Sequence, residues 1–139
     1  MAEQGPEVFE THISWVLMLG ERVYKVKKPV RTGFLDFSTV EARDRACRRE
    51  VELNRRLAPD VYTGVATMHD EKGRVCEHVV VMRRMPDDRR LSALVQQGAD
   101  VGDGLRALAR RMASFHTHAA MSPEIDRAGR RGVVASHWE

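Results

Sequence analysis

One acidic residue of this sequence stands where a helix is expected to be apolar. Glu50 lies four residues after Ala46 and three before Leu53, and at 3.6 residues per turn these positions share one helix face. A carboxylate on a face that packs against a sheet is costly unless a cation neutralises it. We therefore expect Glu50 to have a basic partner on another element.

Lys25 is the candidate partner of Glu50. It lies within the run VYKV at 23–26, where strand alternation would point Lys25 to one face of a sheet and its neighbours to the other. A mid-strand lysine paired with a helix glutamate can hold its ammonium against nucleotide phosphates. A second interpretation stays open, in which Lys25 lies on an exposed lysine-rich face and Glu50 pairs with Arg43 or Arg49.

The patterns around these residues predict an α+β fold with an antiparallel sheet. Strands are expected from apolar and β-branched runs bounded by turn residues, at 8–11, 13–19, 22–28, 61–69 and 75–82. Helices are expected from capping residues and apolar periodicity, at 38–57, at 91–97, at 105–119 and from Ser122 onward. One long helix would therefore connect two hairpins, and shorter helices would follow Pro86.

The order of these motifs resembles the opening of aminoglycoside-phosphotransferase-type kinases, including bifunctional proteins that join such a kinase to an ATP-binding domain. The resemblance extends over nearly the whole chain, and three segments carry it: THISWVLMLGERVYKVKKPVRTGFLDFST, EARDRACRREVELNRRLAPDVYTGV and VVVMRRMP. It implies a truncated protein-kinase-like fold. Residues 1–86 would form an antiparallel-sheet N-lobe with one long helix and a hinge, and residues 87–139 the first helices of a C-lobe.

The resemblance also implies roles for four residues. Lys25 would match the third-strand lysine that contacts the α and β phosphates of ATP, and Glu50 the helix glutamate that orients it. The backbone around Arg83 and Met85 would match the hinge that hydrogen-bonds adenine. The implied activity is transfer of the ATP γ-phosphate, with Mg²⁺, to a hydroxyl of a small-molecule acceptor.

The sequence departs from that family at two places. Between the first two expected strands, Glu10-Thr11-His12 stands where the family has a glycine-bearing phosphate loop. The His-Gly-Asp-type catalytic loop with its downstream Asn, and the later metal-binding Asp, have no counterpart in the sequence. Because phosphoryl transfer needs a base and metal-held phosphates, we assign no catalytic or metal residue and expect the chain alone to be inactive.

Two other classes of function stay open, and the first of them follows from the net positive charge of the chain. With 23 Lys and Arg against 20 Asp and Glu, the chain could be a small basic protein that binds nucleic acid or an acidic partner. It could also be a non-catalytic nucleotide sensor that acts through a protein partner. Nucleic acid is less expected because no basic stripe with interleaved aromatics occurs. Apolar surface left by a missing C-lobe would favour self-association or binding of that lobe.

The remaining signals concern location and isolated side chains. No run approaches the roughly 20 apolar residues that span a bilayer, and no signal segment opens the chain, so we expect a cytoplasmic protein without a membrane partner. Cys47 and Cys76 are widely separated and are expected to be reduced core residues. His116 and His118 point to different sides of a helix, and His116 is expected to be a core histidine, not a metal ligand.

Overall fold

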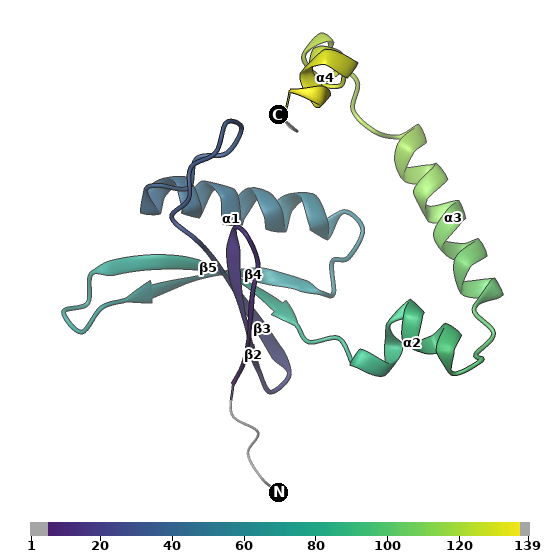
Figure 1. Ribbon diagram of the computed structural model, residues 1–139, viewed down its shortest axis with the longest axis horizontal. Helices are drawn as coiled ribbons and strands as arrows, with labels where there is room; N and C mark the ends of the chain where they lie inside the picture. The colour runs from purple at the N-terminus through teal and green to yellow at the C-terminus, as the bar shows by residue number, and fades with distance from the viewer. Residues whose placement is uncertain (1–5, 137–139) are drawn as a thin grey trace, which may run out of the picture. The chain divides into compact units, whose positions relative to one another are not determined.

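The computed structural model describes residues 6–136 and contains a five-stranded antiparallel sheet (Figure 1). Its strands are β1 (Glu7–Glu10), β2 (Ser14–Leu19), β3 (Arg22–Lys27), β4 (Tyr62–His69) and β5 (Val75–Arg83). They lie in the order β1-β2-β3-β5-β4, so β3 pairs with β5 across the middle of the sheet. The predicted strands and the α+β class are confirmed, and every strand end lies within one residue of its expected position.

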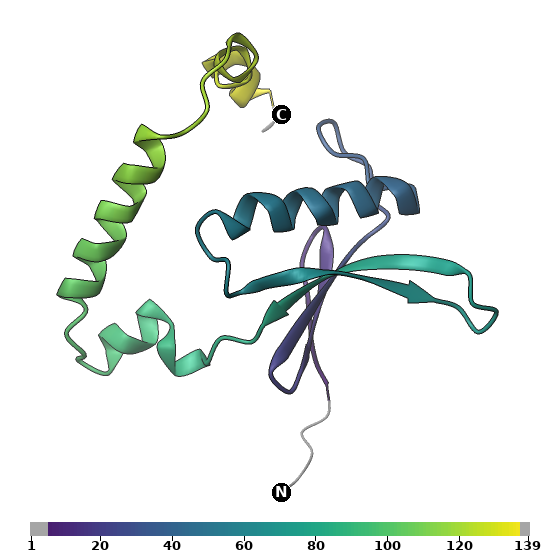
Figure 2. The same cartoon turned by 180° about the vertical axis from the view of Figure 1, so that it is seen from behind.

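Helix α1 (Val40–Arg55) connects β3 to β4 and crosses one face of the sheet, as Figures 1 and 2 show from opposite sides. Thr39 caps it, because the Thr39 hydroxyl accepts a hydrogen bond of 3.1 Å from the Ala42 N–H. Glu41 in the first turn complements the positive end of the helix dipole. The long helix between the two hairpins is thus confirmed.

The core of this part lies between α1 and β5. Cys47 and Val51, one turn apart on α1, pack against Val80, and all three are buried. The buried stripe of α1 therefore differs from the expected apolar face with Ala46 and Leu53, and Leu57, where the helix was expected to end, follows the helix with 36% of its surface exposed. Glu50 lies beside the buried stripe, one residue before Val51, with its side chain 15% exposed.

The contacts divide the chain into two compact units, the first ending at Arg84 and the second beginning at Met85. Within its described residues, 85–136, the second unit holds a 3-10 turn, η1 (Asp87–Arg89), and four helices: α2 (Leu91–Gln96), α3 (Gly102–Thr117), α4 (Pro123–Ala128) and α5 (Arg131–Ala135). The expected helices are present, and α5 was not predicted. None of the described residues of the second unit is buried.

Two expectations about buried side chains are wrong. Cys76 is an exposed free cysteine of β5, whereas Cys47 is a buried one, as expected. His116 is exposed on α3, because the apolar stripe that it was expected to join is itself exposed, with Leu108 at 54%. Side-chain burial depends on which neighbour covers a face, and the periodicity of one helix does not contain that information.

No helix among residues 6–136 combines the length and the apolar character needed to cross a membrane.

Candidate functional site

Lys25 and Glu50 form the ion pair that the sequence predicts. Lys25 lies in the middle of β3, in register with Val16 of β2 and Val80 of β5, and its Nζ is 2.9 Å from Glu50 Oε1. The open alternative, in which Glu50 pairs with an arginine of its own helix, is not what the structure contains. Those arginines bind other carboxylates: Arg43 binds Glu77, and Arg49 binds Glu52.

Lys27 is a second partner of Glu50 that was not predicted. Its Nζ lies 2.6 Å from Glu50 Oε2, its side chain is only 5% exposed, and the ammonium lies 5.1 Å from the centroid of the Phe37 ring. The signal was present in the sequence, because residues two apart on a strand point to the same face and Lys25 and Lys27 therefore both face α1. Glu50 is consequently held by two cations, one on each carboxylate oxygen.

Glu50, Lys25 and Lys27 form a charged cluster with more positive than negative charge. Burial has the largest single influence on Glu50 and raises its pKa, but hydrogen bonds to Lys27 and Lys25 and the charges of both lysines together outweigh burial. The pKa of Glu50 therefore lies below its usual value, and the carboxylate stays ionised at neutral pH. Two ammonium groups then face one carboxylate, and this surplus of positive charge suits an anionic ligand.

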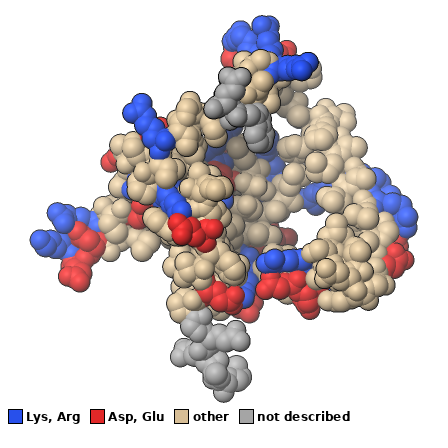
Figure 3. Space-filling view, in the orientation of Figure 1, with Lys and Arg blue, Asp and Glu red and all other residues tan. Residues whose placement is uncertain are grey.

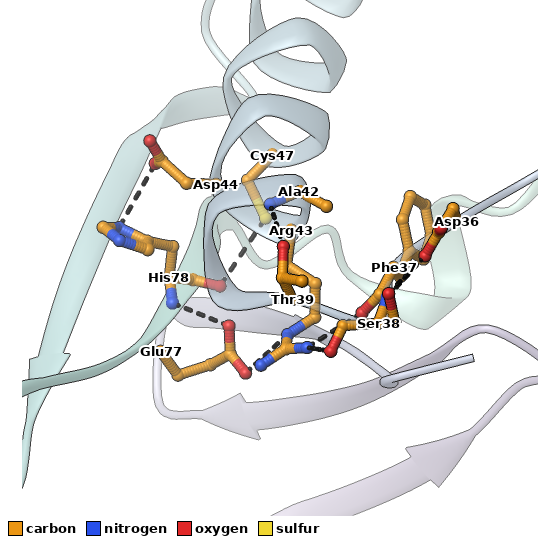
Figure 4. Close-up of polar contacts among 10 residues, drawn as sticks. All are labelled: Asp36, Phe37, Ser38, Thr39, Ala42, Arg43, Asp44, Cys47, Glu77 and His78. Carbon is orange, nitrogen blue, oxygen red and sulfur yellow. Dashed lines mark hydrogen bonds and ion pairs between the residues drawn. The ribbon is translucent and has the colours of Figure 1, made fainter. Parts of the chain in front are cut away.

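An ion pair at the start of α1 fixes the helix on β5 (Figure 4). Arg43 Nε donates to Glu77 Oε2 at 2.8 Å, and Arg43 Nη1 donates to the Phe37 carbonyl at 2.8 Å. The Arg43 side chain is 8% exposed and that of Glu77 is 17% exposed. Since Glu50 follows Arg43 by seven residues, or about two helical turns, this contact also restrains where Glu50 meets β3.

A histidine contact between β5 and α1 lies beside that pair. His78 Nδ1 is 3.2 Å from Asp44 Oδ1, and the Cys47 thiol donates to the His78 carbonyl at 3.5 Å (Figure 4). Asp44 and Cys47 lie on α1 and His78 on β5, so α1 meets β5 through polar as well as apolar contacts. The Lys25–Glu50 pair is therefore built on a helix with several fixed points on the sheet.

The expected hinge residues, Arg83 and Met85, make no contact with the Lys25–Glu50 pair among the contacts of the described residues. Arg83 ends β5 in register with Arg22, three residues before Lys25 on β3. Its backbone N–H already donates to the Val61 carbonyl at 2.8 Å, which removes that donor from any contact with adenine. Met85 is the first residue of the second unit, and 51% of its surface is exposed. Lys25 and Glu50 are thus the two predicted site residues that the structure brings together.

An apolar row lies next to the charged cluster on the same face of β2, β3 and β5. Met18 pairs in register with Val23, and Val23 pairs with Met82. Val23 is two residues before Lys25, which on a strand is about 7 Å along the same face. Along β3, this face therefore changes from the apolar Val23 to Lys25 and Lys27.

The chain is 47% identical to mycobacterial proteins of unassigned function. These are an uncharacterised protein of Mycobacterium bovis and its counterparts in two strains of Mycobacterium tuberculosis, each matched over 132 residues, or 95% of this chain. The chain spans about a quarter (26%) of the length of these curated relatives. No protein-family model matches the chain. No solved structure matches it either.

Metal ligands do not gather in the part of the chain that the structure describes. Within residues 6–136, no three His, Cys, Asp or Glu side chains lie close enough together to hold a metal ion. The carboxylate nearest to the lysines is Glu50 itself, and both of its oxygens are bound by ammonium groups. These residues therefore offer charge and hydrogen-bond donors to a ligand, but they do not form a Mg²⁺ site.

Proposed function

We propose that this chain is the nucleotide-binding N-terminal part of an ATP-dependent small-molecule phosphotransferase of the aminoglycoside-phosphotransferase type, and that it acts in the cytoplasm. The observation that carries the proposal is the ion pair between Lys25 on the third strand and Glu50 on the helix that follows it. In kinases a lysine and a glutamate at these places hold the ammonium against the phosphates of ATP. Two free cysteines fit a reducing compartment.

The two rows of side chains on β2, β3 and β5 support one orientation for ATP. The triphosphate would lie at Lys25, where the cluster has surplus positive charge, and the adenine would lie toward Met18, Val23 and Met82, at the apolar end of the same face. The adenine ring loses little free energy when it leaves water for an apolar surface, whereas the phosphates need cations and hydrogen-bond donors. The backbone near Arg83 would meet the adenine edge through groups other than its occupied N–H.

Transfer itself would require more than these residues. Mg²⁺ is expected to accompany ATP, but the described residues do not fit a metal site, and no residue of the chain matches the family's catalytic base. We therefore propose that the chain alone binds ATP and does not phosphorylate an acceptor. The small hydroxyl-bearing acceptor would be bound elsewhere in a longer protein, as the length of the relatives, of which this chain spans 26%, allows.

The arginines favour this proposal over a polyanion-binding surface. Most exposed arginines of α1 and of the turns already contact carboxylates or carbonyls: Arg48 binds Asp44, Arg49 binds Glu52, Arg74 binds Asp70, and Arg55 binds the carbonyls of Tyr62 and Thr63. Figure 3 shows blue and red side chains intermixed on the face that it draws. Arginines occupied in this way attract a phosphate backbone weakly.

Calorimetric titration of ATP into the purified chain, with and without Mg²⁺, tests the proposal. We expect binding in the wild type and a loss of at least about tenfold in Lys25→Ala, because one charge-assisted contact contributes about 1.5–3 kcal/mol. Lys28→Ala is the matched control, because Lys28 contacts Glu10 and the Trp15 ring and makes no contact with Glu50 in the described structure. A folded chain that binds no ATP, or a Lys25→Ala variant that binds it unchanged, would contradict the proposal.

A further inference from the structure

We infer that the two lysines that contact Glu50 have different roles. Lys27 is a positioning residue that holds the carboxylate in place, and Lys25 is the lysine that turns to the anionic ligand. This inference rests on the proposed nucleotide site, but its first part concerns the ligand-free protein and can be tested without a nucleotide. It assigns a role to Lys27, a residue that the resemblance to kinases leaves without one.

The two contacts differ in burial. The Lys27 side chain is 5% exposed and that of Lys25 is 27% exposed, although both approach Glu50 within hydrogen-bond distance. Lys27 is also enclosed by its neighbours, since its ammonium lies over the Phe37 ring and its register partner on β2 is Ser14, which is fully buried. A ligand can therefore reach the ammonium of Lys25 more readily than that of Lys27.

Breaking the Lys25–Glu50 contact is also expected to cost less free energy than breaking the Lys27–Glu50 contact. If Lys25 leaves Glu50 for a phosphate oxygen, the half-buried carboxylate keeps Lys27 as its partner and remains neutralised. If Lys27 left instead, an almost completely buried ammonium would lose its only carboxylate contact among the described residues. An uncompensated buried charge is strongly destabilising, so the exchange is expected at Lys25. A carboxylate with two cations can thus give one of them to a ligand without reorganising α1.

Lysine labelling in the folded wild type tests this division directly. An amine-reactive acetylating reagent, read by mass spectrometry, should modify Lys25 at least about 10-fold faster than Lys27, because a buried amine reacts only when the structure opens locally. ATP with Mg²⁺ should slow the labelling of Lys25 by several fold and leave that of Lys27 unchanged. Lys72, exposed in the turn between β4 and β5, is the internal reference and should not respond to ATP.

Each outcome of the labelling decides one part of the inference. Lys27 labelling as fast as Lys25, or ATP protecting Lys27 in place of Lys25, would overturn the division. If ATP protects neither lysine and calorimetry finds no binding, the proposed function fails, while the Lys25 to Lys27 rate ratio still tests the ligand-free asymmetry.

Variants supply the second readout. Lys27→Met should lower the melting temperature by at least about 5 °C, and Lys25→Met by less than about 3 °C, because the more buried contact is the costlier one to break. Lys27→Arg, which keeps the charge, should retain more of the ATP affinity than Lys27→Met, whereas neither Lys25→Met nor Lys25→Arg should retain wild-type affinity. Equal melting temperatures for the two methionine variants would contradict the positioning role.

Discussion

Arg43 and Glu77 form an ion pair of 2.8 Å between the start of α1 and β5, and both side chains are largely withdrawn from water. The guanidinium also donates to the Phe37 carbonyl at the end of the loop that leads into the helix. One side chain therefore joins the loop, the helix and the sheet. Because the Phe37 ring lies under the ammonium of Lys27, the same contacts support the charged cluster at Glu50.

Removing one member of this pair should be costly. Glu77→Ala leaves the Arg43 guanidinium buried without its carboxylate, and we expect a loss of about 3 kcal/mol in the free energy of unfolding, measured by urea denaturation. The control is Glu52→Ala, which removes the exposed partner of Arg49 and should change stability little. Similar losses in the two variants would mean that the buried pair does not anchor α1.

The cap of α1 gives a smaller and more local effect. Thr39→Ala removes the hydroxyl that accepts from the Ala42 N–H, and we expect a loss of about 1 kcal/mol in the free energy of unfolding. Thr39→Asn should restore most of it, because asparagine caps as well as threonine. If Thr39→Asn is as unstable as Thr39→Ala, the cap does not explain the loss.

Replacing Ser14, unlike Thr39, should not lower the free energy of unfolding. Its side chain is fully buried, and its Oγ has no hydrogen-bond partner in the described structure. Since burying an unsatisfied hydroxyl carries a cost that alanine avoids, Ser14→Ala should leave the free energy of unfolding unchanged or raise it by up to about 1 kcal/mol. A clear loss of stability would show that the hydroxyl has a partner in solution.

Glu50 predicts a particular pH dependence of stability. Its pKa in the folded protein is below the usual value of 4.5, so folding favours the ionised form. The stability that Glu50 contributes is fully present above pH 4.5 and is lost as the pH falls through the lower pKa of the folded state. Urea unfolding of wild type and Glu50→Gln should therefore differ most near neutral pH and converge in acid. A difference that does not shrink in acid would contradict this account.

Much of the fold of the first unit could be predicted because the sequence patterns that determine its strands and helix lie within short segments of the chain. Apolar runs between turn residues define the five strands, Thr39 and Glu41 mark the start of α1, and a carboxylate beside an apolar stripe required a cation. Lys27 was missed because three lysines between 25 and 28 read as a solvated face, whereas the position of α1 and of Phe37 encloses one of them.

The second unit was less predictable in its burial. Helices α2, α3 and α4 were expected from periodicity and from the Ser122 cap, whereas α5 was not, and the expectation that His116 lies in a core was wrong because its stripe is exposed. Cys76 was likewise expected inside and lies exposed on β5. Cysteine is buried on average and His116 lies at an apolar periodic position, but in both cases the tertiary environment decides whether the side chain is covered. The roles of Arg83 and Met85 at a nucleotide stay predictions.

The central claim is that the Lys25 ammonium contacts the phosphates of ATP and not its base. Calorimetric affinities for ATP and for adenosine, each measured with wild type and Lys25→Ala, test it most directly. We predict that wild type binds ATP at least about tenfold more tightly than adenosine, and that Lys25→Ala loses this preference while its affinity for adenosine stays unchanged. A preference for ATP that survives in Lys25→Ala would contradict the claim.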